Sequence, residues 1–256
     1  MKTKEDIISN WLPRYTGCET EQFGEYVLLC NFKKYLGIFC EFNNVSVFDE
    51  NANMPCATAG GITMINFGIG SPNAAIIMDL LSAIAPKAVL FLGKCGTLKE
   101  KNSLGDFILP IAAIRGDGTS ADYLPPEVPA LPAFSLQRAV STTIRDMGLD
   151  YWTGTVYTTN RRVWEHDESF KTYLKQIRSL AIDMETATIF TVGFANNIST
   201  GALLLTSDMP MISTGIKTAE SDKKVTDNFV ATHVKIGVEA LKLIKRDGRS
   251  IKHLKF

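Results

Sequence analysis

The chain has 256 residues, of which 45% are hydrophobic and 21% are charged, close to the average for globular proteins. This composition excludes intrinsic disorder, collagen-like repeats and small disulfide-stapled scaffolds. Lysine and arginine together number 27, and so do aspartate and glutamate, which leaves no net charge. The chain therefore has no long-range attraction for a nucleic-acid backbone or an anionic membrane surface. We expect a small-molecule ligand instead, with no nucleic-acid partner and no membrane partner.

The cysteines and histidines argue against a metal centre. No two of the five cysteines form a C-x-x-C pair, and their odd number is consistent with free thiols in a reducing cytoplasm. The three histidines, His166, His233 and His253, form no H-E-x-x-H motif, so we expect no metal. The first ten residues lack the apolar core of a secretory signal, and we expect a cytoplasmic location.

Apolar runs of strand length alternate with helix-length segments along the chain. We predict strands at residues 26–30, 36–41, 45–48, 62–67, 88–92, 106–114, 152–157, 179–182 and 201–206. We predict helices at 74–84, 135–147, 168–177, 185–195 and 221–245. This alternation favours a single three-layer α/β domain over residues 1–256, with a mixed central sheet flanked by helices. In such sheets the ligand lies beyond the carboxyl ends of the strands.

Two glycine-containing segments follow predicted strands. Gly68 and Gly70 form a G-x-G motif before Ser71 and Pro72, which is typical of the start of a helix. The motif lacks the third glycine of a dinucleotide fingerprint, which argues against a nicotinamide enzyme. The second segment, 93–97, places Lys94 between glycines. Taken alone, the G-x-G segment is as consistent with an ordinary strand-to-helix connection as with a ligand site. Segment 93–97, taken alone, favours a tight structural turn.

Three acidic residues also follow predicted strands. Asp183 and Glu185 lie at a strand-to-helix junction, and Asp208 ends the next apolar strand. Each carboxylate alone is explained equally well by a helix N-terminus or a turn. Acids at the ends of neighbouring strands together predict a site, in which burial could make one carboxyl a proton donor. No G-x-S-x-G elbow is present to support a serine hydrolase.

In order and spacing, four motifs resemble the nucleoside phosphorylase/nucleosidase family: Gly68-Ile69-Gly70-Ser71-Pro72, Gly93-Lys94-Cys95-Gly96, Asp183-Met184-Glu185-Thr186-Ala187 and Ser207-Asp208. Segments 110–120 and 157–165 are similar to those of the short bacterial AMP nucleosidases within that family. Only residues 1–25 precede the first predicted strand, so the resemblance predicts no counterpart of the N-terminal domain of the long members. It implies a phosphorylase/hydrolase-like fold.

The resemblance also implies roles for individual residues. Asp208 would protonate purine N7 as the glycosidic bond lengthens, since adenine is a poor leaving group as an anion. Glu185 would accept hydrogen bonds from the ribose hydroxyls, Met184 would pack under the sugar, and Gly70 would let the backbone approach the ribose. Predicted base contacts are Tyr157, Thr159 and Asn160. Predicted phosphate-binding cations are Lys94, Arg115, Arg161 and Arg162, for each of which an ordinary surface ion pair is equally consistent.

One departure from the family bears on the nucleophile. Phosphorylases of the family place a glycine, and an arginine four residues later, just after the first strand to bind inorganic phosphate. Segment 30–35 of this chain has neither residue. This favours water as the nucleophile, although no residue matches the glutamate that acts as general base in the adenosylhomocysteine hydrolases of the family.

We therefore predict hydrolysis of AMP to adenine and ribose 5-phosphate, without a metal or organic cofactor, by a homo-oligomer that is a hexamer or is built from dimers. Two enzyme alternatives stay open: a purine or uridine nucleoside phosphorylase, and a methylthioadenosine/adenosylhomocysteine nucleosidase. A catalytically silent nucleotide-binding module is the non-enzyme alternative.

Overall fold

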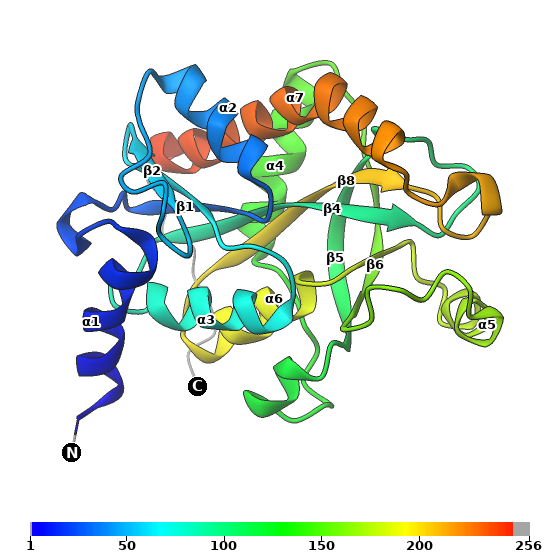
Figure 1. Ribbon diagram of the computed structural model, residues 1–256, viewed down its shortest axis with the longest axis horizontal. Helices are drawn as coiled ribbons and strands as arrows, with labels where there is room; N and C mark the ends of the chain where they lie inside the picture. The colour runs from blue at the N-terminus through cyan, green and yellow to red at the C-terminus, as the bar shows by residue number, and fades with distance from the viewer. Residues whose placement is uncertain (1, 248–256) are drawn as a thin grey trace.

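The computed structural model describes residues 2–247, which form an eight-stranded mixed sheet with helices on both faces (Figure 1). The strands are β1 (Tyr26–Cys30), β2 (Cys56–Ala59), β3 (Ile62–Asn66), β4 (Ala88–Thr97), β5 (Phe107–Gly116), β6 (Trp152–Thr159), β7 (Ala181–Asp183) and β8 (Thr200–Asp208). The helices are α1 (Lys4–Thr16), α2 (Lys33–Asn43), α3 (Ser71–Leu81), α4 (Phe134–Asp146), α5 (Glu168–Gln176), α6 (Thr186–Ala195) and α7 (Ala219–Asp247). His253 lies outside the described residues.

The order of the strands is β2-β3-β1-β4-β7-β6-β5-β8, and β8 also pairs with β4. The second pairing closes β4, β7, β6, β5 and β8 into a ring of hydrogen-bonded strands. β4 and β8 run parallel, with Cys95 opposite Thr206. A register shift after Cys95 then brings Gly96 opposite Asp208. This irregularity sets the relative position of the last residues of the two strands.

Alternate residues of each central strand face different helices. In β1, Leu28 belongs to the apolar cluster that contains buried residues of α2, α4 and α7, whereas Val27 and Leu29 belong to the cluster with α3 and α6. Figure 1 shows the corresponding helix layers above and below the sheet. Within residues 2–247, none of the helices has both the length and the apolar character that crossing a membrane requires.

The prediction of strands at 36–41 and 45–48 is wrong. Residues 36–41 belong to α2, and residues 45–48 form no strand. The buried residues of α2 are Tyr35, Leu36, Ile38 and Phe39, a spacing that fits one face of a helix. Two further elements were not predicted, the amphipathic helix α1 and the short strand β2.

The segment 93–97 is part of β4 and not a turn. Its glycines serve close packing. A side chain at Gly93 would collide with the ring of Phe91, and one at Gly96 would lie 2.9 Å from Pro210. The extended backbone carries Lys94 and Cys95 to the end of the sheet, where the candidate site lies.

A buried histidine connects three elements on the α7 side of the sheet. His233 of α7 is fully buried, with Nε2 2.9 Å from the carbonyl oxygen of Leu203 in β8. Its Nδ1 lies 3.0 Å from the hydroxyl of Tyr35 in α2. In the neutral tautomer, Nε2–H donates to the carbonyl and Nδ1 accepts from the hydroxyl. Burial lowers the pKa of His233 to about 3.

This shift predicts loss of stability in acid. The unfolded chain binds a proton on His233 below its ordinary pKa of 6.5, whereas the folded protein does not until about 3. Between these values, the free energy of unfolding should therefore fall with decreasing pH, by up to about 1.4 kcal/mol per pH unit from this group. Urea unfolding of the wild type and of His233→Gln at several pH values measures the contribution of His233 to the free energy of unfolding. Equal pH dependence in the two proteins would contradict the prediction.

Candidate active site

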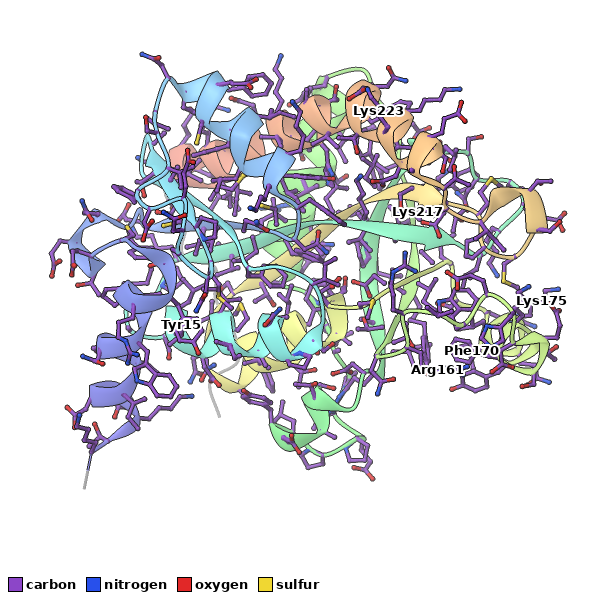
Figure 2. The ribbon with its side chains drawn as sticks, viewed as in Figure 1. Tyr15, Arg161, Phe170, Lys175, Lys217 and Lys223 are labelled. Atoms are coloured by element: carbon purple, nitrogen blue, oxygen red, sulfur yellow. The ribbon has the colours of Figure 1, made fainter. Side chains whose placement is uncertain are left out.

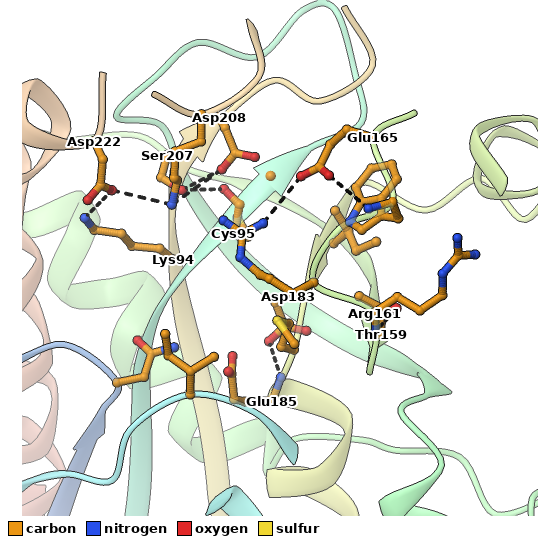
Figure 3. A pocket seen from close by; sticks show the side chains of 18 of the residues that line it. Lys94, Cys95, Thr159, Arg161, Glu165, Asp183, Glu185, Ser207, Asp208 and Asp222 are labelled. Atoms are coloured by element: carbon orange, nitrogen blue, oxygen red, sulfur yellow. Dashed lines mark hydrogen bonds and ion pairs between the residues drawn. The ribbon is translucent and has the colours of Figure 1, made fainter. Parts of the chain in front are cut away.

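A cavity of about 290 Å³ lies at the carboxyl ends of β4, β6, β7 and β8 and beside the residue that follows β1 (Figure 3). The predicted site residues that line it are Lys94, Thr159, Arg161, Arg162, Met184, Glu185 and Asp208. Segments far apart in sequence thus meet at one edge of the sheet, where ligands of α/β proteins bind.

The other predicted site residues lie near the cavity or away from it. Gly70 does not line the cavity, but its N–H donates to Glu185 Oε1 at 2.7 Å. Tyr157 packs edge-on against Phe170, in an aromatic cluster beside the cavity. Asn160 is exposed and does not line the cavity either.

Arg115 is not brought to the cavity. Its guanidinium donates to the carbonyl oxygens of Ser120, Leu124 and Val128, at 2.6–2.9 Å. It also donates to the hydroxyl of Ser120 and to the carbonyl of Pro125. The arginine therefore stabilises the loop that follows β5, and few of its donors remain for a ligand.

Glu185 and Asp183 form a buried acidic pair at the end of β7. Asp183 is held by the hydroxyl of Thr158 at 2.7 Å and by the N–H of Thr186 at 2.8 Å. Burial raises the pKa of Asp183. Burial and, secondly, the neighbouring Asp183 raise the pKa of Glu185 to about 8. The cavity thus contains a carboxyl group that changes its ionisation close to neutral pH.

Asp208 ends β8 on the other side of the cavity from Glu185 (Figure 3). The Ser207 hydroxyl donates to Asp208 Oδ1 at 2.7 Å. The ammonium group of Lys217 lies 3.7 Å from the same oxygen and 3.4 Å from Asp222 Oδ1. The other carboxylate oxygen of Asp208, Oδ2, is left for a ligand that enters the cavity.

Lys94 is a structural cation in the cavity wall. Its side chain is 3% exposed, and Nζ donates to Asp222 Oδ1 at 2.8 Å and to the Thr226 hydroxyl at 2.7 Å. Nζ also lies 5.0 Å from the centre of the Phe32 ring. Burial outweighs Asp222 and lowers the pKa of Lys94. These contacts hold the first turns of α7 against β4.

The two arginines after β6 are more exposed. Arg161 pairs with Asp167 at 2.9 Å, and its guanidinium carbon lies 5.1 Å from the centre of the Phe170 ring (Figure 2). Arg162 pairs with Glu165 at 3.4 Å. Both side chains are about half exposed, at 45% and 60%. Their carboxylate partners are less exposed, Asp167 at 24% and Glu165 at 15%, so each arginine is anchored on one side and open to solvent on the other.

The structure adds residues to the site that the sequence did not single out. They are Asn31, Phe32, Ile69, Trp164, Glu165, Lys217 and Asp222. Asn31 could have been found from the sequence, because it directly follows a predicted strand, much as Asp208 lies at the end of one. Lys217 and Asp222 have none, because they come from the connection to α7 and its first turn. Across residues 2–247, no group of three or more metal-binding side chains is found.

The sequence profile of the Phosphorylase superfamily matches residues 25–242, which contain every residue of the cavity. The chain belongs to the Phosphorylase superfamily. The family predicted from the sequence is therefore confirmed, and with it the mixed α/β fold.

Two AMP nucleosidases are similar to this member of the superfamily. The protein from Escherichia coli (strain K12) is 28% identical over 283 residues, which cover 93% of this chain and 58% of that protein. The chain thus spans little more than half the length of this relative. The crystal structure from Bacteroides thetaiotaomicron is 55% identical and covers 96% of this chain and 99% of that one, with a TM-score of 0.87.

A more distant solved structure shares the fold alone. The uridine phosphorylase of Vibrio fischeri is 23% identical and covers 93% of this chain and 99% of that one, with a TM-score of 0.80. At this identity a shared fold does not establish a shared site, so the chemistry has to be argued from the cavity itself.

Proposed function

We propose that this chain is an AMP nucleosidase that hydrolyses the N-glycosidic bond of AMP to adenine and ribose 5-phosphate. The observation that carries the proposal is the placement of Asp208 and Glu185 on facing sides of one cavity. The similarity to the Bacteroides AMP nucleosidase over nearly the full length of both chains supports the choice of substrate.

In this proposal each side of the cavity serves one end of the bond that breaks. Asp208 donates a proton to N7 of the base, and the electron pair of the C1′–N9 bond leaves with adenine. Positive charge then develops on the sugar, as in other glycoside cleavage. Glu185 faces the sugar, accepts hydrogen bonds from its hydroxyls and stabilises that charge, with Met184 packed beneath. A water oxygen bonds to C1′ and loses one proton.

The remaining predicted contacts are proposed for the base and the phosphate. Thr159 lines the cavity and is assigned to the base, with Tyr157 and Asn160 in the same segment. Arg161 and Arg162 are the cations proposed for the 5′-phosphate. Lys94 contributes charge from the wall, since its hydrogen bonds are already used. We leave Arg115 out of the phosphate site because the loop after β5 occupies its donors.

Substitution of the arginines tests the phosphate assignment. Arg161→Ala and Arg162→Ala should each lower kcat/KM for AMP by roughly 10–100-fold, which is the value of a lost charge-assisted hydrogen bond. Inhibition by ribose 5-phosphate, which carries the phosphate, should weaken in both variants, whereas inhibition by adenine should change little. Release of free base from AMP in the presence of each product measures the effect. An equal loss of inhibition by the two products would contradict the assignment.

The proposed reaction is tested by release of free base from AMP, GMP, UMP, adenosine and methylthioadenosine, each with and without inorganic phosphate. Adenine should appear from AMP without added phosphate, and adenosine should be inert. Cleavage that depends on phosphate would indicate a nucleoside phosphorylase. Preference for methylthioadenosine would indicate the other class of nucleosidase, and binding of AMP without cleavage would indicate a silent module.

We also propose that residues 1–256 form a single domain that acts in the cytoplasm as a hexamer or other assembly of dimers, without a metal or organic cofactor. The composition and the family resemblance support this part of the proposal. Light scattering after size exclusion measures the number of subunits. Activity that persists after exhaustive chelation is the expected result for a metal-free enzyme.

A further inference from the structure

We propose that Ser71 is a positioning residue for the sugar side of the cavity. Its hydroxyl fixes the backbone of Met184, so that the Gly70 N–H meets the carboxylate of Glu185 in one orientation. The inference rests on the proposed function, because that function assigns Glu185 to the sugar. It adds a residue outside the cavity on which the orientation of this carboxylate depends.

The first evidence is a pair of hydrogen bonds between two short segments. The Ser71 hydroxyl donates to the carbonyl oxygen of Met184 at 2.7 Å, and the Gly70 N–H donates to Glu185 Oε1 at the same distance. The partners are 113 and 115 residues apart in sequence. Met184 and Glu185 line the cavity, whereas Gly70 and Ser71 do not. The two bonds therefore act on the cavity from outside, through two of the residues that form its wall.

The second evidence is that the Ser71 hydroxyl does not cap its own helix. A serine before a proline is typical of the capping position, but α3 begins at Ser71 itself and its capping residue is Gly70, which has no side chain to accept a bond. The hydroxyl instead reaches Met184, which lies between the end of β7 and the start of α6. Ser71 thus joins the start of one helix to the residues that precede another.

The third evidence is the backbone of Gly70, which has φ 99° and ψ 153°. Only glycine adopts this conformation readily. Space is not the reason for the glycine, since an added Cβ would meet only Pro72 Cδ within 4 Å, at an ordinary contact distance of 3.8 Å. The conformation itself is what the site uses, because it directs the N–H to Glu185 while Ser71 starts the helix. Rare backbone conformations of this kind cluster at functional sites.

The Gly70 N–H opposes the effect of burial on Glu185. Burial and, secondly, Asp183 raise the pKa of Glu185 to about 8, whereas the N–H of Gly70 binds the ionised form and lowers the pKa. If Ser71 no longer holds the Met184 backbone, the bond between this N–H and the carboxylate should become longer and more mobile. The ionised form then loses part of its stabilisation, and the pKa of Glu185 should rise further.

The test compares the pH profile of kcat/KM for AMP in the wild type and in Ser71→Ala, which loses only the hydroxyl. In the proposed reaction the ionised carboxylate stabilises the charged sugar, so kcat/KM rises with pH as Glu185 ionises. In Ser71→Ala the midpoint of this rise should move upwards by roughly 0.5–1 pH unit, because a weakened hydrogen bond stabilises the charged form less. Above the rise, kcat/KM should be lower by roughly 10-fold, since a displaced group is costly. An unmoved midpoint would overturn the proposal, whatever the value of kcat/KM above the rise.

Ser179→Ala is the matched control for a loss of stability. The Ser179 hydroxyl is also buried and also donates to a backbone carbonyl, that of Ala181 at 2.9 Å. Ser179 lies at the other end of β7 from Glu185 and does not line the cavity. The substitution should lower the thermal midpoint of unfolding, as Ser71→Ala does, but leave the pH profile of kcat/KM as in the wild type. An equal shift of the profile in both variants would assign the effect to a general loosening of β7 and overturn the proposal.

Gly70→Ala shows whether Ser71 acts through the Gly70 N–H. Alanine rarely adopts a φ of 99°, so the N–H should turn away from Glu185, and the rise in kcat/KM should move to higher pH in this variant too. If both residues act through one bond, the double variant should be shifted no further than Gly70→Ala alone. Additive shifts would show that Ser71 acts independently and would overturn the proposal.

The wild type separates failure of this inference from failure of the proposed function. If the wild type releases no adenine from AMP, the proposed function fails. If the wild type releases adenine and only the Ser71 results fail, the AMP nucleosidase proposal stands.

Discussion

Replacement of Asp208 by asparagine is expected to lower kcat for AMP by roughly 10²–10⁴-fold, the usual contribution of a general acid. The amide keeps the size of the side chain and accepts the hydrogen bond from Ser207, but it has no proton to give to N7. The fold should be preserved, because the Asp208 side chain is 14% exposed and its other neighbour, Lys217, also contacts Asp222. Adenine release at saturating AMP and the thermal midpoint together measure the effect.

Asp227→Asn is the matched control for this substitution. Asp227 also pairs with a lysine, Lys223, but its side chain is 51% exposed and the pair lies one helical turn apart on α7. The kcat of the Asp227→Asn protein should stay within about twofold of the wild-type value, since exposed ion pairs contribute little. An Asp208→Asn protein with wild-type kcat would remove the acid from the mechanism and leave the fold as described.

Glu185→Gln is expected to produce the second large effect, a fall of roughly 10²–10³-fold in kcat/KM for AMP. The ionised carboxylate stabilises the charged sugar, and a neutral amide lacks the negative charge to do so. Because the pKa of Glu185 is raised to about 8, the protonated form dominates below this value and the carboxylate above it. Wild-type kcat/KM should therefore rise with pH up to about 8. The amide introduced by Glu185→Gln cannot ionise, so this rise should be absent from the variant.

Asp183→Asn provides the control for the pH dependence. The negative charge of Asp183 is the second cause of the raised pKa of Glu185, after burial. Removal of this charge should move the rise in kcat/KM to lower pH. Above the new pKa of Glu185, kcat/KM should still reach a plateau. The asparagine oxygen can still accept from the Thr186 N–H, but the NH₂ group that replaces the other oxygen cannot accept from the Thr158 hydroxyl. The thermal midpoint is therefore measured beside the pH profile. A pH profile identical to that of the wild type would assign the titration to another group.

The strands that the sequence predicts well are those covered on both faces. Segments 26–30, 88–92 and 201–206 are continuous apolar runs, and each lies within a central strand. The run at 36–41 has a similar composition, but it forms the helix α2. A short apolar run does not distinguish the two structures, and its packing against α7 and β3 decides the outcome.

The site is predictable where a side chain directly follows or ends a strand. Glu185 and Asp208 were singled out for this reason, Met184 was added by the family resemblance, and all three line the cavity. Asp222 could not be found in this way, because its contact with Lys94 spans 128 residues and depends on the path of the chain after β8. Arg115 shows that a position near a strand end does not by itself bring a side chain to the cavity. It lies near the end of a strand, but the loop that follows binds its guanidinium.

The pairing of β8 with β4 has a consequence for synthesis on the ribosome. β4 ends at Thr97, whereas the strand that covers one of its edges begins at Thr200. Until that later segment emerges, the growing polypeptide displays an open, apolar strand edge, the kind of surface that aggregates. The substrate cannot relieve this exposure, because Asp208 is the last residue of the covering strand itself.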